Sequence, residues 1–353
     1  MRDSKNIRVA TWLYCGAIGI IIQILLGGIT RLTGSGLSIT EWQPLLGILP
    51  PLNDKSWQHS FDTYKEIAQF KVVNPHFNLS DYKSIFFWEW LHRNWARTLG
   101  IIFIIPFFVF ICQKRIDKTT FTRLTILFFL GLLQGVIGWI MVKSGLNDTM
   151  TSVNDIRLMI HFITALILLC YTLWMAFQLS IPKLIITSLP ISAQPARIIL
   201  ILIFLQMSFG ALIAGSKAAL AAPTWPDMNG YLIPPAIYQY DPAVTYLLVV
   251  QFIHRLLAFL IAALIIMLYK KTAKSKTSLL YTYASNCSVI LVCIQIFLGI
   301  ATLLNSFNPA YKVFALLHQS TGILLLINLL LLFYILQLKP QQDKSIKHIK
   351  KVN

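Results

Sequence analysis

Charged side chains are scarce in this sequence. Only 12% of its 353 residues are Asp, Glu, Lys or Arg, whereas soluble domains carry about 25%. Hydrophobic residues make up 56% of the chain and occur in runs long enough to cross a bilayer, which takes roughly 20 residues. The composition excludes an ordinary soluble domain and predicts an all-α polytopic membrane protein embedded in a lipid bilayer.

Acidic residues are the rarest charged group, with 13 against 30 Lys and Arg, a net charge of +17. Between the apolar runs, the basic excess falls in alternate segments that include both termini: 18 Lys and Arg with 3 acidic residues there, against 9 and 9 in the other segments. Basic segments stay on the cytoplasmic side. The charge therefore predicts cytoplasmic termini, and it does not indicate a nucleic-acid partner.

Cysteine is absent from every predicted outer loop, which excludes a disulfide framework there. The five cysteines lie in the apolar runs or at their inner ends, where we expect small core residues: Cys15, Cys112, Cys170, Cys287 and Cys293. The sequence also lacks a small-residue cleavage site after its first apolar run. We expect that run to persist as a helix, in a bacterial cytoplasmic (inner) membrane rather than an organelle.

Eight runs are long enough to span, and they repeat as two sets of four. The predicted spans lie near 11–30, 85–112, 124–142, 157–178, 197–215, 244–269, 279–304 and 312–337. In register, His92-Arg93 matches His254-Arg255, and His161 matches His318. An even number of spans per set makes the repeat parallel. We expect two pseudo-symmetric four-helix bundles, residues 1–180 and 190–340.

The matched positions contain the most informative residues, four histidines inside apolar runs. His92, His161, His254 and His318 each lie near the outer end of a predicted span. Imidazole in hydrocarbon is costly unless something binds it, and neutral imidazole is a good haem-iron ligand. Two pairs therefore predict two haem sites, although backbone or serine partners would also satisfy buried histidines. His59 and His76, in the long outer loop 31–84, have no repeat partner and should be exposed.

One position distinguishes the two halves. Glu89 lies three residues before His92, on the same helix face, whereas Gln251 precedes His254. Glu89 is either an acid–base group beside one porphyrin or half of an ion pair with Arg93 that neutralises the helix end. Arg93 and Arg255 are candidate partners for haem propionates, the alternative being contact with lipid headgroups.

Long motifs in a fixed order make the chain resemble heme A synthase over nearly its whole length. They are GGITRLTGSGLSITEWQPLLGILPP, WEWLHR, QGVIGWIMVKSGL, TWPDMNGYLIPP and QFIHR. Some members carry a cysteine pair in the first outer loop. This chain has none there, so it is similar to the proteobacterial and mitochondrial branch, and a thiol-based step is not expected.

The resemblance implies oxidation of a methyl group of haem O to a formyl group, by successive hydroxylations, to give haem A for cytochrome c oxidase. Carried over by position, His92 and His161 would flank the substrate haem O, His254 and His318 would ligate a haem b cofactor, and Glu89 would be the essential carboxylate. The resemblance also implies haem O synthase and a membrane electron acceptor as partners.

Two other functions remain compatible with parts of the pattern. A dihaem b-type electron-transfer cytochrome would use the same four histidines, but it would give Glu89 no task and would place its haems near both membrane faces. A parallel-repeat transporter would have its site near the midplane, with broken helices. The shared depth of the four histidines near one face favours neither.

Overall fold

The computed structural model describes residues 4–41, 46–147, 149–181, 192–238, 241–273 and 279–338. Within these ranges the chain is helical apart from loops and one isolated bridge between Met228 and Tyr231. Eight helices are long and apolar enough to cross a membrane: α1 (Ser4–Leu32), α3 (Leu79–Cys112), α4 (Lys118–Lys143), α5 (Asp155–Ser180), α6 (Gln194–Ser216), α7 (Pro242–Ala273), α8 (Leu279–Leu304) and α9 (Tyr311–Gln337). The predicted all-α fold and eight spans are confirmed for the described residues.

Several helices extend beyond the predicted apolar runs because polar caps, rather than hydropathy, set their ends. α3 begins at Leu79, since the Asn78 side chain accepts from the backbone N–H groups of Ser80 and Asp81, and Asp81 in turn accepts from the Asn78 N–H. Such a reciprocal cap satisfies donors that the first helical turn would leave unpaired. The Asn78 cap therefore starts the helix before the predicted apolar run, which begins near residue 85.

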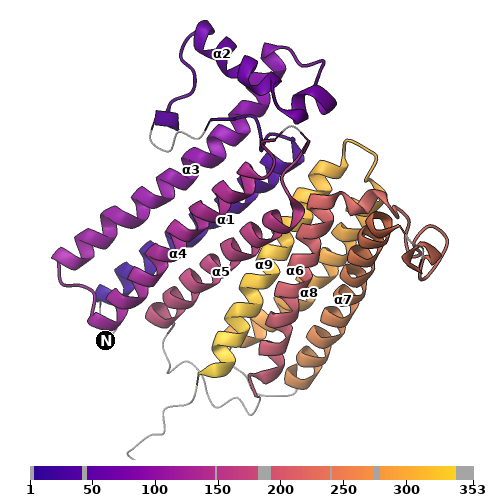
Figure 1. Ribbon diagram of the computed structural model, residues 1–353. Coiled ribbons are helices and arrows are strands. Elements are labelled where there is room, and N and C mark those ends of the chain that lie inside the picture. The colour runs from indigo at the N-terminus through magenta and orange to yellow at the C-terminus, as the bar shows by residue number, and fades with distance from the viewer. Residues whose placement is uncertain are drawn as a thin grey trace, which may run out of the picture.

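Consecutive helices pack as antiparallel hairpins and close into rings (Figure 1). α1 contacts α3 and α5, and α4 contacts α3 and α5; in the second half, α6 contacts α7 and α9, and α8 contacts α7 and α9. The halves meet where α5 packs against α6 and α9, and α1 against α9. α1 starts and α9 ends at one end of the bundle, opposite α2 (Figure 1). The terminal residues 1–3 and 339–353 and most of the predicted linker, 182–191, lie outside the described residues.

The apolar core runs across the contact between the halves. Side chains from both halves are fully buried in it: Leu166 and Leu169 of α5, Ile199 of α6, and Leu326 and Leu329 of α9. Lipid tails are as apolar as these side chains, so van der Waals packing rather than removal from water holds these helices together. This core packs the spanning helices of the first and second sets of four against one another.

Of the five cysteines, Cys170 packs against this core and the other four lie outside it. Cys15, Cys112, Cys287 and Cys293 are exposed on the helix surfaces, and Cys170 is half-buried. The prediction of small core residues is therefore wrong for four of the five. Their helices are apolar on all sides, so hydropathy alone does not separate a lipid-facing position from a core position.

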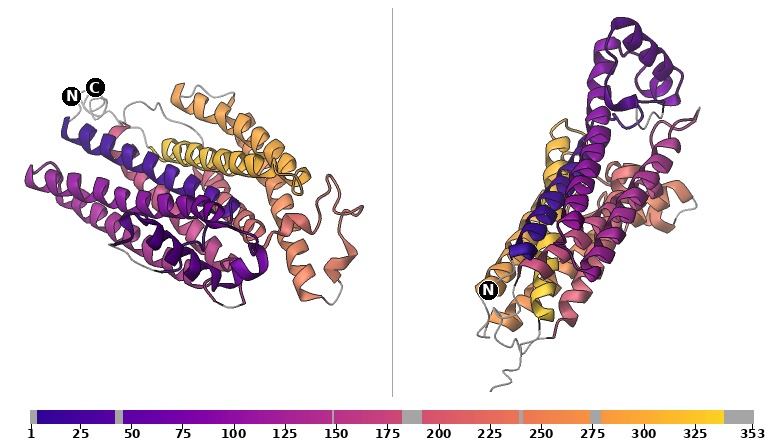
Figure 2. Two further views of the ribbon diagram at one scale, coloured as in Figure 1. Left: turned by 90° about the horizontal axis from the view of Figure 1, so that it is seen from above. Right: turned by 90° about the vertical axis from the view of Figure 1, so that its left-hand side faces the viewer.

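The long first outer segment is folded rather than extended. It contains α2 (Asp54–Lys65) and the short π-helical turn η2 (Gln69–Val73), which lie beyond the end of the bundle (Figures 1 and 2). The matching segment of the second half contains the short 3-10 helices η4 (Ala218–Leu220) and η5 (Pro235–Tyr238). The two halves thus differ most in what covers their outer ends.

Candidate functional site

Each of the four histidines lies on the second helix of a hairpin, and its ring packs against the first. On that facing helix, a glutamine and a glycine four residues later contact the ring: Gln23 and Gly27 for His92, Gln134 and Gly138 for His161, Gln206 and Gly210 for His254, and Gln295 and Gly299 for His318. A Cβ on these glycines would lie 2.8–3.1 Å from the imidazole Cε1 atoms. The close approach requires glycine. We call each glutamine–glycine pair a seat.

The C-terminal pair, His254 and His318, has the geometry of two ligands on one metal ion. The ring centroids are 6.4 Å apart and the rings are inclined by 71°. Two imidazoles bound at about 2.0–2.1 Å per nitrogen would have centroids roughly 6 Å apart. The Nδ1 atoms of His254 and His318 lie 3.1 Å from the backbone carbonyl oxygens of Gln206 and Gln295, respectively. Since a carbonyl only accepts, each Nδ1 carries the proton, and the unprotonated Nε2 atoms of His254 and His318 lie 3.3 and 3.4 Å from the side-chain amide nitrogens of Gln206 and Gln295.

The N-terminal pair is held differently. The Gln134 amide nitrogen donates to the His161 backbone carbonyl at 2.9 Å and lies 3.1 Å from Nδ1. The Gln23 amide nitrogen likewise donates to the His92 carbonyl at 3.1 Å and lies 3.2 Å from Nε2 and 3.4 Å from Nδ1. The side-chain amide therefore reaches Nδ1 of both N-terminal rings, whereas in the C-terminal pair it reaches Nε2.

Several buried polar atoms beside the histidines have no hydrogen-bond partner among the described residues: Gln23 Oε1, Gln206 Oε1, Gln295 Oε1 and Arg255 Nε. An unpaired buried donor or acceptor costs about 1–3 kcal/mol. Haem would bring a carboxylate to the Arg255 Nε–H, whereas the three amide oxygens need a hydrogen-bond donor that haem does not supply. The paired imidazoles and the arginine therefore fit haem, which would bring iron to the former and a carboxylate to the latter.

Glu89 is held on all sides in the interior, with 2% of its surface exposed. Its Oε1 accepts from Arg93 Nη2 at 2.6 Å, while Oε2 accepts from the Ser38 hydroxyl at 2.7 Å and from the Ile39 N–H at 2.9 Å. Arg93 also donates to the Ile39 carbonyl at 3.1 Å. The Glu89–Arg93 ion pair predicted from the sequence is present, and the Ser38 and Ile39 donors complete the set of hydrogen bonds to the carboxylate.

The turn that supplies these donors is itself fixed by the outer segment. Tyr82, fully buried, donates to the Ser38 carbonyl at 3.1 Å. The Gln69 amide donates to the Gly34 carbonyl at 3.0 Å, and its oxygen accepts from Tyr64. Burial raises the pKa of the Tyr64 phenol above its ordinary value, so it stays a neutral donor. Helices α2 and η2 thus position the donors on Glu89.

In the second half, the residue that corresponds to Glu89 is Gln251, and it faces a backbone carbonyl instead of hydrogen-bond donors. The Gln251 amide donates to the Ala218 carbonyl at 3.3 Å, and its oxygen accepts from Arg255 at 3.2 Å. Arg255 also donates to the backbone carbonyls of Asp227, Ala222 and Thr224 at 2.8–3.0 Å. The same helix position therefore carries an amide, because the loop above it presents carbonyl oxygens.

Comparison with known proteins matches this architecture over nearly the whole chain. Residues 10–330 fit the model of the COX15-CtaA family, described as cytochrome oxidase assembly proteins. The chain belongs to this family.

Three similar members all carry the name "Heme A synthase". The protein of Flavobacterium johnsoniae is 37% identical over 91% of this chain and 96% of its own length. That of Methylorubrum extorquens is 38% identical over 84% and 79%, and that of Parvibaculum lavamentivorans 41% identical over 73% and 76%. The family and the eight apolar helices together make the chain a multi-pass membrane protein.

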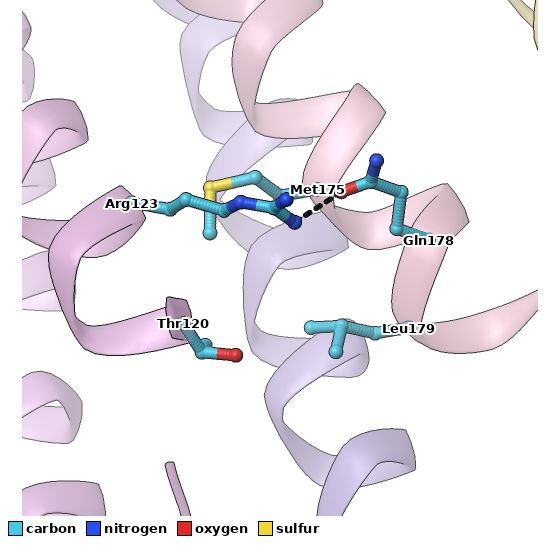
Figure 3. Close-up of a pocket in the computed structure, with 5 residues that line it drawn as sticks. All are labelled: Thr120, Arg123, Met175, Gln178 and Leu179. Carbon is cyan, nitrogen blue, oxygen red and sulfur yellow. Dashed lines mark hydrogen bonds between the residues drawn. The ribbon is translucent and has the colours of Figure 1, made fainter. Parts of the chain in front are cut away.

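Other positions considered from the sequence lie away from this family site. His59 and His76 are exposed in the outer segment, as predicted. A small pocket between α4 and α5 is lined by five residues and crossed by a 2.7 Å hydrogen bond from Arg123 to Gln178 (Figure 3). Gln178 follows His161 along α5 by about 25 Å at 1.5 Å per residue. This pocket is therefore unrelated to the imidazoles.

The seats are the functional feature that the sequence reasoning missed. The glutamines and glycines of all four seats occur at one shared spacing. The pattern Gln-x-x-x-Gly occurs once on each of α1, α4, α6 and α8. On the histidine helices, the residue one turn after each histidine is also small: Ala96, Ala165, Ala258 and Gly322. A search for two-helix repeats would have found it.

Proposed function

We propose that this chain is a heme A synthase, an oxidoreductase that converts a methyl group of haem O to a formyl group to give haem A for cytochrome c oxidase. The family match and the names of its relatives support the reaction. The observation that carries the assignment is a chemical difference between two sites on similarly arranged helices. A buried carboxylate, Glu89, lies beside one histidine pair, and an amide, Gln251, lies beside the other. A protein that only carried electrons would have no use for this difference.

In the C-terminal half, His254 and His318 are the iron ligands of a resident haem b. The centroid distance and the Nδ1 contacts to backbone carbonyls support this assignment. Haem b, when bound, supplies a one-electron redox centre close to the substrate half. Arg255, whose Nε is buried without a partner, is placed to pair with a propionate.

In the N-terminal half, His92 and His161 flank the substrate, haem O. Two successive two-electron oxidations of the methyl carbon, each adding a hydroxyl group from water and releasing two protons, give a hydrated aldehyde that loses water to become the formyl group. A membrane electron acceptor takes the four electrons. Glu89 accepts a proton from the attacking water on the Oε1 lone pair that Arg93 does not occupy, or it stabilises positive charge on the reacting carbon. Arg93 holds that carboxylate or a propionate.

The architecture that goes with this function is two parallel four-helix halves, residues 1–180 and 190–340, related by a pseudo-two-fold axis along the membrane normal. Matching helix contacts in the two halves support it. The basic excess on one side supports cytoplasmic termini and a bacterial cytoplasmic membrane. Haem O synthase, the source of the substrate, is the expected delivery partner.

Haem extraction from the purified full-length protein tests the function. A heme A synthase yields a mixture of haems B, O and A; a dihaem cytochrome yields haem B alone, and a transporter yields none. His254→Ala should abolish the low-spin b-type spectrum. His59→Ala, an exposed histidine outside the bundle, is the matched control. An unchanged spectrum in His254→Ala would refute ligation by this residue.

A further inference from the structure

The four seats share one construction, which depends on the glycine. In a helix, the carbonyl of residue i accepts from the N–H of residue i+4, and the side chain at i+4 leans back over the preceding turn. With glycine at i+4, the carbonyl of the glutamine is uncovered and its second lone pair is free to accept. At Gly210 and Gly299 the imidazole occupies that opening, with Cε1 3.1 and 2.9 Å from the position of a Cβ.

The two halves use this opening differently. In the C-terminal half, both Nδ1 atoms meet the uncovered carbonyl at 3.1 Å. In the N-terminal half, the Gln134 amide nitrogen lies 3.1 Å from Nδ1 of His161, and the Gln23 amide nitrogen lies 3.4 Å from Nδ1 and 3.2 Å from Nε2 of His92. The side-chain amides of the C-terminal seats instead meet Nε2 alone, at 3.3 and 3.4 Å. Among the described residues, no hydrogen bond joins either of the N-terminal Nδ1 atoms to a carbonyl.

The orientation of the Gln134 amide is fixed by its other partners. Its oxygen accepts from the Thr164 hydroxyl at 2.6 Å, and its nitrogen donates to the His161 carbonyl at 2.9 Å. Turning the amide over would place its oxygen against that carbonyl, two acceptors in contact. The group facing Nδ1 of His161 is therefore a donor, which favours an unprotonated Nδ1 and a proton on Nε2.

We propose that the seats determine which haem is permanent and which exchanges. A seat that presents its backbone carbonyl to Nδ1 favours the tautomer whose Nε2 lone pair can bind iron, whereas a seat that presents its side-chain amide to Nδ1, without that carbonyl contact, leaves this tautomer unsupported and makes ligation reversible. The proposal rests on the proposed function, since it assigns the permanent haem to His254 and His318 and the substrate to His92 and His161. Reversible ligation lets haem O enter and haem A leave. The glutamines and glycines are positioning residues, acting through the histidines.

The hydrogen bond from Nδ1 to the backbone carbonyl has two measurable consequences for a bound haem. A hydrogen bond from Nδ1 makes the ligand more basic, which tightens binding and stabilises ferric iron. Loss of such a bond typically weakens metal binding on the order of 10- to 100-fold. It should also move the reduction potential of the haem to more positive values.

The first experiment blocks the Gln295 backbone carbonyl with a methyl group. In Gly299→Ala, the added methyl group would lie 2.9 Å from Cε1 of His318 and displace Nδ1 from the Gln295 carbonyl. The expected result is haem b retention lower by about 10- to 100-fold and a more positive midpoint potential in the purified holoprotein. Gly135→Ala is the matched control, because nothing lies within 4 Å of a Cβ there. Gly299→Ala with the same haem content and potential as Gly135→Ala would overturn the proposal.

The second experiment removes the amide donors without adding an atom against any neighbour, so it stays decisive if the alanine variant fails to assemble. Gln134→Met should raise the amount of haem O and haem A that remains on the purified protein. Gln295→Met should leave haem b retention unchanged, since the backbone carbonyl remains. Equal effects of the two substitutions on their haems would refute the asymmetry. Haem extraction from the unmodified protein tests the proposed function separately: haem B alone would refute that function, whereas the response of haem b to Gly299→Ala would still report on the seat.

Discussion

Replacing Glu89 by glutamine preserves the shape of the side chain and removes one negative charge and one acceptor. The carboxylate accepts from three donors, Arg93 at 2.6 Å, Ser38 at 2.7 Å and Ile39 at 2.9 Å. An amide has a single oxygen. With that oxygen toward Arg93, its NH₂ group faces Ser38 and Ile39; the Ser38 hydroxyl can rotate to accept, but the Ile39 N–H cannot.

The energetic cost follows from this count. One buried N–H without an acceptor costs about 1–3 kcal/mol. Complete removal of one partner of a buried ion pair costs about 3–5 kcal/mol, and the amide, which still accepts from Arg93, should cost less. Both figures are below the roughly 5–15 kcal/mol that stabilises a folded domain. Glu89→Gln should therefore fold and keep its b-type haem spectrum, while conversion of haem O falls about 10²- to 10⁴-fold, the range for loss of an acid–base group.

The assay measures the haem O to haem A ratio and the b-haem spectrum in the same purified sample. Ser38→Ala is an informative companion, because it removes one donor and keeps the carboxylate; activity should drop by less than in Glu89→Gln. Turnover at the unmodified rate in Glu89→Gln would refute the assignment of Glu89. Loss of the b-haem spectrum would show instead that the carboxylate supports the fold of both halves.

Two further predictions concern packing and the second outer loop. Gly215→Ala should destabilise the contact between α5 and α6 by about 1–3 kcal/mol, because its Cβ would lie 2.7 Å from the Cβ and 2.9 Å from the Cα of Asp155; thermal unfolding in detergent should show a lower midpoint than in Gly135→Ala, and equal midpoints would contradict this. The pKa of Asp227 is lowered from its ordinary value of 3.8, first by the Thr224 hydroxyl and then by a backbone N–H. A lowered pKa contributes stability that is present above the ordinary value and lost as the pH falls through the folded value. Limited proteolysis should therefore leave this loop intact at about pH 5 and cut it at more acidic pH, and equal cleavage under both conditions would show that the contact does not hold the loop.

The helices and the histidine pairs were accessible from the sequence because both depend on local, periodic signals. Apolar length predicts a span, and His92 and His254 stand out against hydrocarbon whatever the tertiary packing. The ion pair of Glu89 with Arg93 also follows from i, i+4 spacing on one helix. These predictions needed no knowledge of which helices touch.

The rest of the site was not accessible because it depends on contacts between distant segments. Ser38 and Ile39 reach Glu89 only because α2, η2 and Tyr82 fix the turn above α3. The exposed position of Cys287 was likewise hidden, since helices that face lipid are apolar on both sides. Hydropathy identifies membrane helices but does not orient them.

The chemical difference between the two sites arises in the loops rather than in the bundle. The helices repeat a ligand, an arginine directly after it in His92-Arg93 and His254-Arg255, and a polar residue one turn before. The first loop presents a hydroxyl and an N–H to that polar residue, which suits a carboxylate; the second presents the carbonyl of Ala218, which suits an amide donor. Gln251→Glu alone would point a carboxylate at a carbonyl oxygen, two acceptors in contact. A second acid–base site would therefore require the first loop as well as the glutamate, so on the proposed function the outer segment acts by positioning the donors on Glu89.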